Sequence, residues 1–354
     1  MTTKRRTPAP ITEPHPAPGR KLVMSTMWGH SPEWRRHVDF YVTDEFGTWR
    51  DMRRLLGLAD RKQAAILFGA VSIQHRYRDF VFAFLLKHRR GPRPRVLVTD
   101  ATWKPESRAL SRLTGLPASW FGLPLRVAVR LIDGTHVRYG VLSTDELHTF
   151  PKLWGVDPDR VIFTPFPATI DPDTPITHGD YLFAGGNSLR DYDLLERALA
   201  PGGPPTRVAS TWTPSRPIPH LRAGPVPHAE FVELLAGCRA AVVPLEVSVR
   251  SAGQQSYLNA MMLGKPVVVT EAPGVRDYIQ DGVTGVVVPP EAEALRRAIV
   301  HVMDPANADH YREMGERARA WVLANATDTI YKDRVLLDAV GLDRGRPRAR
   351  TTES

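Results

Sequence analysis

The chain has 354 residues, of which 42% are hydrophobic and 24% are charged, and both fractions are typical of folded globular proteins. This length favours two domains over a single hydrophobic core. No apolar run is long enough to span a bilayer, and no apolar segment follows the basic N-terminus as it does in a secretory signal. Membrane-spanning and secreted proteins are therefore not expected, and the sequence predicts a cytoplasmic protein.

The formal net charge of +9, which comes mainly from arginine, favours anionic partners such as nucleotide phosphates, an acidic membrane surface or nucleic acid. A solvated, arginine-rich surface without a particular partner explains the charge equally well. Because the basic residues are spread along the chain without an aromatic-basic module, nucleic acid is not an expected partner. Peripheral contact with the inner membrane face stays open.

The single cysteine, Cys238, excludes an intramolecular disulfide and lies among apolar residues, so a buried thiol in a reducing compartment is expected. The histidines are scattered without the spacing of metal ligands, so no metal site is expected. Residues 1–20, which are rich in proline, and the arginine-rich residues 342–354 predict a disordered leader and a disordered tail.

From residue 21 onward, short apolar runs alternate with helical stretches. An amphipathic helix is predicted to end near Gly91, between the second and third apolar runs. Alternation of strands and helices is typical of a parallel sheet with crossover connections. The buried strands expected in this half of the chain are 22–25, 64–69, 96–98, 137–142 and 160–164.

A proline-rich break at residues 165–175 interrupts this pattern, which then restarts and predicts a second doubly wound α/β domain. We place the boundary near residues 170–178. The strands expected after the break are 181–184, 207–209, 240–243, 266–270 and 285–288. The chain is thus expected to hold two Rossmann-like domains, at 21–172 and 177–326, followed by a C-terminal helix at 327–341.

Gly185 and Gly186 follow a predicted strand, at the end of a parallel sheet where ligands bind. Glycine lets a phosphate approach the backbone, and Asn187 or Ser188 suits the N-cap of a following helix. The guanidinium of Arg190 is able to pair with a phosphate in a forked geometry. A tight strand-to-helix turn with a surface arginine is the alternative interpretation.

A second polar segment precedes the helix predicted at 257–263. Its small residues, amides and arginine suit phosphates bound on backbone N–H groups at the positive end of a helix. Ordinary capping is the alternative, although three amides at the start of an otherwise apolar helix are hard to explain in that way. The candidate binding residues of this segment are Arg250, Ser251, Gly253, Gln254, Gln255 and Asn259.

The second half of the chain, from Asp180 to Asp304, resembles family 4 of the GT-B glycosyltransferases. The motifs that carry the likeness occur in the family's order: FAGG, LLERAL, CRAAVVPL, YLNAMMLGKPVVVT and YIQDGVTGVVVPP. The first half is similar more loosely, through VLSTDEL and RVIFTPF. The resemblance implies two domains that face a central cleft, with a nucleotide-diphosphate sugar held by the second domain at the candidate residues named above. It also implies transfer with retention and without a metal or other cofactor.

The family usually places two glutamates eight positions apart, for the donor sugar and the ribose, and the corresponding residues here are Ser251 and Asn259. Of the two family cations after the glycine turn, only Arg190 is kept, since the other position is Asn187. The resemblance therefore implies a retained diphosphate site with different sugar and ribose recognition. Because an amide oxygen accepts hydrogen bonds less strongly than a carboxylate, a thymidine-linked deoxysugar is one hypothesis for the donor.

Asp100 follows a predicted strand, at a position where relatives often carry a histidine that faces the cleft. It is a candidate general base or sugar-orienting group, and a plain turn aspartate is the alternative. Arg190 is the second candidate catalytic residue, because it is able to stabilise negative charge on the leaving phosphate. On the acceptor side the candidates are Gly29, His30 and His75, and both histidines are alternative bases or plain surface histidines.

Three functions fit these patterns. The first is a hexosyl- or deoxysugar glycosyltransferase whose acceptor is a lipid carrier, a polysaccharide end or a small natural product. The second is a different GT-B chemistry, namely a nucleotide-sugar epimerase or an inactive partner of another transferase. A nucleic-acid-binding protein, which the charge alone suggests, is the third and the least supported.

Overall fold

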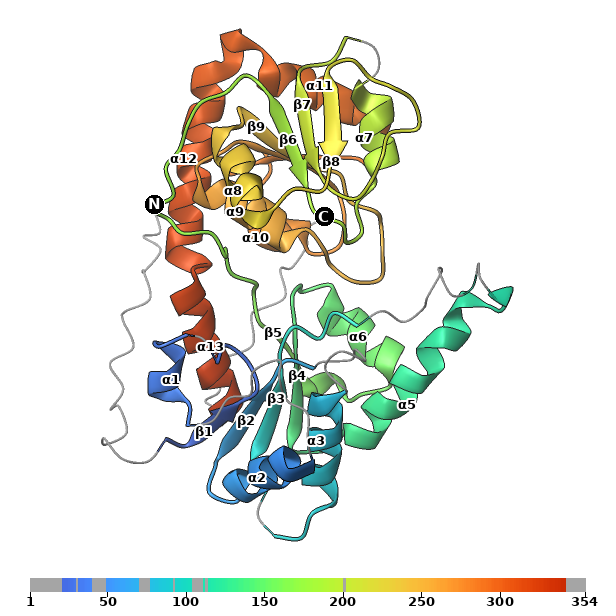
Figure 1. Cartoon of the computed structure of the whole chain (residues 1–354), viewed down its shortest axis with the longest axis vertical. Coiled ribbons are helices and arrows are strands. Elements are labelled where there is room, and N and C mark those ends of the chain that lie inside the picture. Colours follow the sequence, from blue (N-terminus) through green and yellow to red (C-terminus); the bar gives the residue numbers. More distant parts are fainter. Residues whose placement is uncertain are drawn as a thin grey trace, which may run out of the picture.

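A computed structural model describes residues 21–29, 31–39, 49–69, 77–91, 93–103, 111, 114–199 and 202–341. They form two α/β units, one above the other along the long axis of the molecule (Figure 1). Every strand pair in the two described sheets is parallel. The leader expected at 1–20 and the tail expected at 342–354 lie outside the described residues.

The N-terminal unit holds a five-stranded sheet in the order β1-β2-β3-β4-β5. Its inner strands are buried on both faces, which explains why their sequences are apolar runs and not alternating patterns. The strands are β1 (Val23–Ser25), β2 (Ala64–Leu67), β3 (Arg95–Val98), β4 (Val137–Val141) and β5 (Val161–Phe163).

Helices cover both faces of this sheet. On one face the core includes Phe82 and Trp154, and on the other it includes Trp34 and Tyr331. The helices of the first face are α2 (Trp49–Ala59), α3 (Arg78–His88), α5 (Leu123–Ile132) and α6 (Glu146–Trp154). Those of the second face are α1 (Trp34–His37) and α13 (Asp328–Val340). Because α13 returns from the other unit, the end of the described chain closes the core of the first unit.

The C-terminal unit holds a six-stranded sheet in the order β11-β10-β9-β6-β7-β8. The winding reverses between β6 and β9, so a crevice opens at the carboxyl ends of these two strands. The strands are β6 (Leu182–Gly185), β7 (Thr206–Ala209), β8 (Leu221–Gly224), β9 (Ala240–Val243), β10 (Val267–Thr270) and β11 (Val286–Val288).

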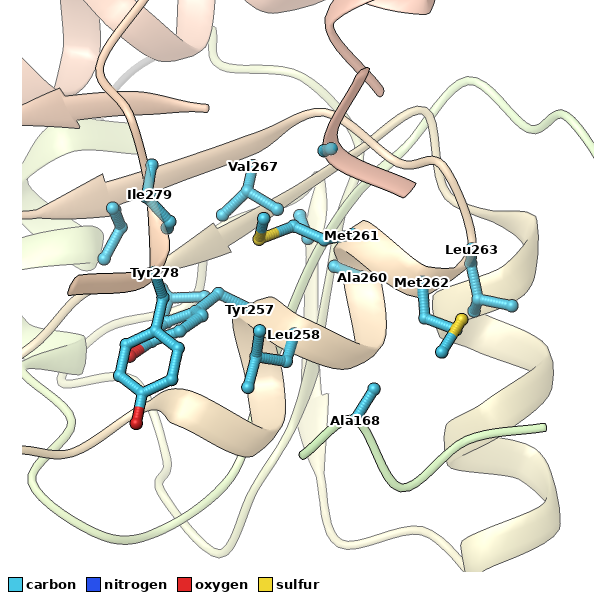
Figure 2. Close-up of a cluster of buried hydrophobic side chains, with 14 of the residues drawn as sticks. Ala168, Tyr257, Leu258, Ala260, Met261, Met262, Leu263, Val267, Tyr278 and Ile279 are labelled. Carbon is cyan, nitrogen blue, oxygen red and sulfur yellow. The ribbon is translucent and has the colours of Figure 1, made fainter. Parts of the chain in front are cut away.

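Two hydrophobic clusters fill the two faces of the second sheet. Helix α9 is central to one of them: its side chains Tyr257, Leu258 and Met261 lie near Val267 and Ile279 (Figure 2). Burying such a side chain contributes about 1.5–3 kcal/mol to stability. The helices of this face are α8 (His228–Gly237), α9 (Gln254–Met262) and α10 (Val275–Tyr278), and those of the other are α7 (Tyr192–Leu199) and α11 (Ala292–Met303). Helix α12 (Ala308–Asn325) contributes side chains to both clusters.

Three details differ from the sequence prediction or complete it. Strand β8 was not predicted, because Leu221–Gly224 is a half-buried edge strand without an apolar run. The helix expected at 257–263 begins three residues earlier, at Gln254. The thiol of Cys238 is fully buried, as predicted, and burial raises its pKa to about 12.

The chain crosses between the two units twice, through residues 164–181 and again between α12 and α13. The two crossings touch, because the N–H of Ala168 donates to the carbonyl of Ala326 at 2.8 Å. Among the helices that the structure describes, none is long and apolar enough to cross a lipid bilayer.

Candidate functional site

A cleft of about 460 Å³ lies between the two units, at the carboxyl ends of their strands. The N-terminal unit lines it with Asp100, Thr102 and Leu142, and the C-terminal unit lines it with the turns after β6 and β9 and the first turns of α8 and α9. The residues expected at the site from the sequence that line this cleft are Asp100, Gly186, Asn187, Arg190, Arg250, Ser251, Gly253, Gln254, Gln255 and Asn259. Gly185 ends β6 directly behind it.

The turn after β6 depends on its two glycines. Gly186 has a φ of +101°, and a Cβ at Gly185 would lie 2.5 Å from the ring of Phe231. Arg190 braces the turn: its guanidinium donates to the carbonyls of Gly185 at 3.3 Å and Ser188 at 2.7 Å. Arg190 is half-buried, and this burial lowers the pKa of its guanidinium below the ordinary value. The turn therefore presents a fixed positive group to the cleft.

The helix after this turn does not begin where the sequence suggested. Helix α7 begins at Tyr192, and its cap is Asp191, whose carboxylate accepts from the N–H of Leu194 at 2.8 Å. The capping role expected of Asn187 or Ser188 is therefore wrong. The Asn187 side-chain oxygen instead accepts from the hydroxyl at 210 (2.7 Å) and from the N–H at 211 (2.9 Å), so it ties the turn to the end of β7.

Gly253 places the start of α9 against the cleft. Its φ of +91° is left-handed, and a Cβ there would lie 2.9 Å from the Leu245 side chain. The first N–H groups of a helix have no partner within the helix and carry its positive dipole end. Because α9 begins at Gln254, the amides Gln254 and Gln255 form its first turn and line the cleft. The two turns of the C-terminal unit therefore converge on one crevice.

Arg250 stands between these two turns. Its Nη2 donates to the hydroxyl of Ser188 at 2.9 Å, so it links the segment before α9 to the turn after β6. Burial lowers the pKa of Arg250, and the nearby carboxylates Glu146 and Asp100 act in the opposite direction. The crevice thus holds two guanidinium groups, one from each turn.

Asp100 faces them from the N-terminal unit. It follows β3 with a left-handed φ of +51°, a conformation that aspartate tolerates better than most residues. Its own carbonyl accepts from the N–H of Thr102 at 2.7 Å, which fixes this bend. Burial raises the pKa of the Asp100 carboxyl to about 6. A carboxyl of this kind changes its charge close to neutral pH, as a proton acceptor must.

The two walls of the cleft touch directly through residues 142–146. The N–H and hydroxyl of Thr144 both donate to the carboxylate of Asp277 at 2.7 Å. The N–H of Gly274 donates to Asp145 at 2.8 Å, and a Cβ at Gly274 would lie 2.6 Å from the Ser143 Cβ. Only glycine allows this approach, so the walls are fitted to each other at backbone distance.

Comparison with known proteins then identifies the fold. Residues 220–304 match the family model described as glycosyl transferases group 1. No curated protein matches the chain by sequence. Among solved structures, a glycosyltransferase from Rickettsia africae ESF-5 superposes with a TM-score of 0.55 at 10% identity, covering 91% of this chain and 90% of the other.

Two further structures agree. Sucrose-phosphate synthase from Thermosynechococcus elongatus has a TM-score of 0.56 at 14% identity, covering 80% of this chain and 75% of that protein. Anabaena Alr3699/HepE, solved with UDP and glucose, has a TM-score of 0.55 at 12% identity, covering 85% and 86%. The chain has the GT-B fold. The family match and the GT-B fold together support glycosyl transfer as the class of reaction.

Ser251, at the first position where GT-B family 4 carries glutamate, is hydrogen-bonded to a carboxylate of the N-terminal unit. The hydroxyl of Ser251 donates to Glu146 of α6 at 2.8 Å, and Glu146 also accepts from Ser143 at 3.0 Å. Glu146 is buried, and burial raises its pKa above the ordinary value, against the effect of these hydrogen bonds. Sequence reasoning missed Glu146, because 105 positions separate it from Ser251.

The second glutamate position, Asn259, serves the connection between the GT-B domains. Its side-chain oxygen accepts from the N–H groups of Thr169 at 2.7 Å and Ile170 at 3.2 Å. The amide of Gln255 donates to the Thr169 hydroxyl at 3.0 Å. By contrast, Nε2 of Gln254 is buried without a hydrogen-bond partner among the described residues. Two of the three amides are therefore structural, and Nε2 of the third is buried beside the crevice without a partner among the described residues.

The acceptor candidates are less well placed than the donor candidates. Gly29 is buried, its carbonyl accepts from Nε of Arg35 at 2.6 Å, and it is not among the described residues that line this cleft. His30 and His75 lie outside the described residues. In the described part of the chain, no group of three or more His, Cys, Asp and Glu side chains lies close enough together to hold a metal ion.

Proposed function

We propose that this GT-B protein transfers a glycosyl group from a nucleotide-diphosphate sugar to an acceptor bound against the N-terminal unit. One observation carries the proposal: two glycine-dependent turns and two half-buried guanidinium groups converge on a single crevice where the strand order reverses. A diphosphate meets its negative charge there with backbone N–H groups, a helix N-terminus and arginine forks. The complex of Anabaena HepE with UDP and glucose supports a donor of this chemical class.

In this proposal the donor wall stabilises the leaving group. Negative charge develops on the departing diphosphate as the bond to the sugar breaks. Arg190 and Arg250 are held in place by hydrogen bonds to the turns, so they need little reorganisation to meet that charge. These fixed cations supply the role that a metal ion has in other transferases, and we propose transfer without a metal, with retention of the anomeric configuration.

Asp100 is the proposed proton acceptor or sugar-orienting group on the opposite wall. Its left-handed backbone and the Thr102 contact hold it at the cleft. Near its raised pKa of about 6, a carboxyl is basic enough to take a proton from an acceptor hydroxyl and is still ionised at neutral pH. Glu146 is a positioning residue in this proposal, because it holds Ser251 and does not line the described cleft.

Our prediction of the donor rests on the two positions where the family has glutamate and this chain does not. With the Asn259 oxygen bonded to residues 169 and 170, it is not free to accept from ribose hydroxyls as a glutamate would. A thymidine-linked deoxysugar, which has one hydroxyl fewer and needs one hydrogen-bond acceptor fewer from the protein, stays our prediction. The same absence of acids favours a second candidate function, a nucleotide-sugar epimerase or an inactive partner of another transferase.

A panel of nucleoside diphosphates and their sugars tests the proposal by thermal shift, because a ligand that binds the folded state alone raises the melting temperature. We expect diphosphates to stabilise the protein and thymidine to outperform uridine. Tighter binding of uridine diphosphate would contradict the thymidine prediction. If no diphosphate changed the melting temperature, the proposed glycosyl transfer itself would be contradicted.

Incubation of the winning donor without an acceptor then separates the candidates. Isomerised donor identifies the epimerase, and an intact donor that is consumed only when acceptors are added identifies the transferase. Repeating the reaction with a chelator tests metal independence, and the anomeric proton coupling of the product tests retention.

A further inference from the structure

A second pocket, of about 180 Å³, lies in the N-terminal unit at the amino ends of β3 and β4, beside the last turn of α13. The cleft lies at the carboxyl ends of the strands, so this pocket is at the opposite end of the same sheet. Its volume leaves room for several water molecules, each of which takes about 30 Å³. We call it the rear pocket, and its polar lining consists of Arg95, Thr135, His136, Arg138 and Asp338.

Two arginines of the rear pocket stand on the same face of the sheet. Leu97 belongs to the hydrophobic cluster that contains Val335 of α13, so its side chain marks the face that α13 covers. Side chains two residues apart in a strand share a face, which places Arg95 there as well. Arg138 of β4 is the register partner of Leu97 and points to the same side. The sheet therefore brings two guanidinium groups together beside the end of α13.

Arg138 and His136 lack partners in the part of the chain that the structure describes. Arg138 is half-buried and forms no hydrogen bond or ion pair with a described residue. Nε2 of His136 is buried and has no hydrogen-bond partner among the described residues. By comparison, Arg160 at the start of the neighbouring strand is paired with Asp133 at 2.7 Å. Because an unpaired buried polar group is costly, the rear pocket is suited to a polar ligand.

The charges around the rear pocket define that ligand further. Burial lowers the pKa of His136, and the cation Arg93 lowers it more, whereas Asp133 acts in the opposite direction. Asp338 is an acidic residue in the lining, and the last carbonyls of α13 carry the negative end of its dipole. A ligand must therefore bring negative charge for the two arginines and a hydrogen-bond donor for these acceptors.

We propose that the rear pocket binds a phosphate group, either as the free ion or as part of a small hydroxylated phosphate monoester. An arginine fork pairs with two phosphate oxygens at once. Inorganic phosphate keeps a P–OH group at neutral pH, and a hydroxylated monoester keeps its alcohol groups, so both are able to donate to Asp338. Sulfate has no proton to donate at neutral pH, so its charge only repels this carboxylate.

A bound phosphate would also fasten α13 to the sheet. Nη1 of Arg95 already donates to the carbonyl of Val340, at the end of α13, at 2.5 Å. Helix α13 follows α12 of the C-terminal unit and packs in the core of the N-terminal unit, so its docking helps to hold the two units together. A ligand that contacts Arg138 as well as Asp338 adds a link between β4 and α13. Phosphate should therefore raise the melting temperature by mass action.

Calorimetric titration with inorganic phosphate tests the rear pocket and needs no nucleotide sugar, so its outcome is independent of the proposed reaction. Phosphate is also able to enter the cleft, so the unchanged protein is compared with both Arg138→Gln and Arg190→Gln. We expect Arg138→Gln to weaken phosphate binding about tenfold or more, and Arg190→Gln to keep the rear site. Arg53→Gln, exposed on α2, removes the same charge from the same unit and should bind phosphate like the unchanged protein.

Asp338→Asn supplies a test in which binding is gained. The unchanged protein should bind phosphate about tenfold more tightly than sulfate, and Asp338→Asn should bind the two anions with similar affinity, because the repulsion of sulfate is removed. A misfolded variant would not gain sulfate binding. Glycerol 3-phosphate separates the two sources of the ligand: tighter binding than inorganic phosphate assigns the site to a monoester, and weaker binding assigns it to the free ion.

Three results would overturn the proposal. Equal phosphate binding by Arg138→Gln and Arg53→Gln would show that the rear pocket is not the site. Binding that Arg190→Gln alone removes would place the phosphate in the cleft. Equal affinity of the unchanged protein for sulfate and phosphate would show that Asp338 does not select the ligand.

Discussion

The two walls of the cleft present different chemical groups: one presents mainly backbone groups with two arginines, and the other presents mainly side chains. The wall of the C-terminal unit offers glycine turns and a helix N-terminus, with Arg190 and Arg250 held by main-chain and hydroxyl oxygens. The wall of the N-terminal unit offers side chains at strand ends, chiefly Asp100 and Thr102. Backbone N–H groups serve any diphosphate, whereas side chains select their partner. In the proposed reaction, donor phosphate binding therefore depends on backbone geometry, and acceptor choice depends on a few side chains.

Replacing Arg190 by glutamine tests the donor wall and should have the largest effect. It removes a preorganised cation, so kcat/KM for transfer is expected to fall by about 10²- to 10³-fold, as for loss of one transition-state donor. Initial rates and the thermal shift with the preferred diphosphate measure the change. Arg197→Gln, on the exposed side of α7, is the matched control and should leave both unchanged. An Arg190→Gln enzyme with the original rate would show that backbone groups alone are sufficient.

Asp100→Asn tests the other wall. We expect kcat to fall about 10²-fold without a comparable loss of diphosphate binding, because proton transfer is lost and the donor wall is intact. With its pKa at about 6, Asp100 is ionised above that pH, so activity should decline as the pH drops through 6, and the variant should lack this decline. Asp333→Asn, exposed on α13, is the control. An unchanged pH profile in Asp100→Asn would assign the base to another residue.

The contact between the walls depends on Gly274, which Gly274→Ala tests against Gly282→Ala. Both glycines have left-handed φ angles, +83° and +73°, so both substitutions should cost about 1 kcal/mol of unfolding free energy in backbone strain. Only at Gly274 would the new Cβ also meet Ser143 of the other wall, at 2.6 Å, and Ser251, at 2.9 Å, whereas nothing lies within 4 Å of one at Gly282. We expect about 2–3 kcal/mol in total for Gly274→Ala by urea unfolding. Equal losses would mean that the walls separate easily.

The sequence correctly predicted which residues of the C-terminal unit line the cleft, because their signals are local. Glycines after apolar strands and amides before an apolar helix need no knowledge of distant residues, and Gly186, Gly253 and Gln254 all line the cleft. The hydrogen bonds of the turn were harder to predict. Asn187 was a candidate N-cap for the next helix, but Asp191 is equally suited to that role and lies at the observed start of α7. Local patterns thus find a turn more reliably than they assign its hydrogen bonds.

Contacts between residues that are far apart in the chain could not be predicted from the sequence. Strand β8 is a half-buried edge, so it has neither an apolar run nor an alternating pattern. The return of α13 to the first sheet and the bond from Ser251 to Glu146 join residues far apart in the chain. The residues around Glu146 do not identify it as part of the site, because an acidic residue after a strand is common at the start of an ordinary helix. Such contacts follow from how the two units pack, and composition or periodicity does not encode that.

Glu146→Gln tests whether the ionised carboxylate of Glu146 helps to join the two walls. Of the changes considered, it should have the smallest effect on the free energy of unfolding. The folded state raises the pKa of Glu146 above 4.5, so it binds that proton more tightly than the unfolded chain does. The free energy of unfolding should therefore fall as the pH rises from the ordinary pKa of glutamate to the raised pKa of Glu146 in the folded protein. At still higher pH, burial of the ionised carboxylate has a small cost.

Glutamine removes that pH dependence and keeps an oxygen to accept from Ser251. We expect Glu146→Gln to equal the unchanged protein or exceed it by up to about 1 kcal/mol at pH 8 in urea unfolding, while Glu146→Ala loses about 1–3 kcal/mol because Ser251 is left without its acceptor. If Glu146→Gln were instead the less stable at pH 8 and equal at pH 4, the ionised carboxylate would be what joins the walls. The N-terminal unit would then supply charge to the donor wall, and the two walls would no longer act separately.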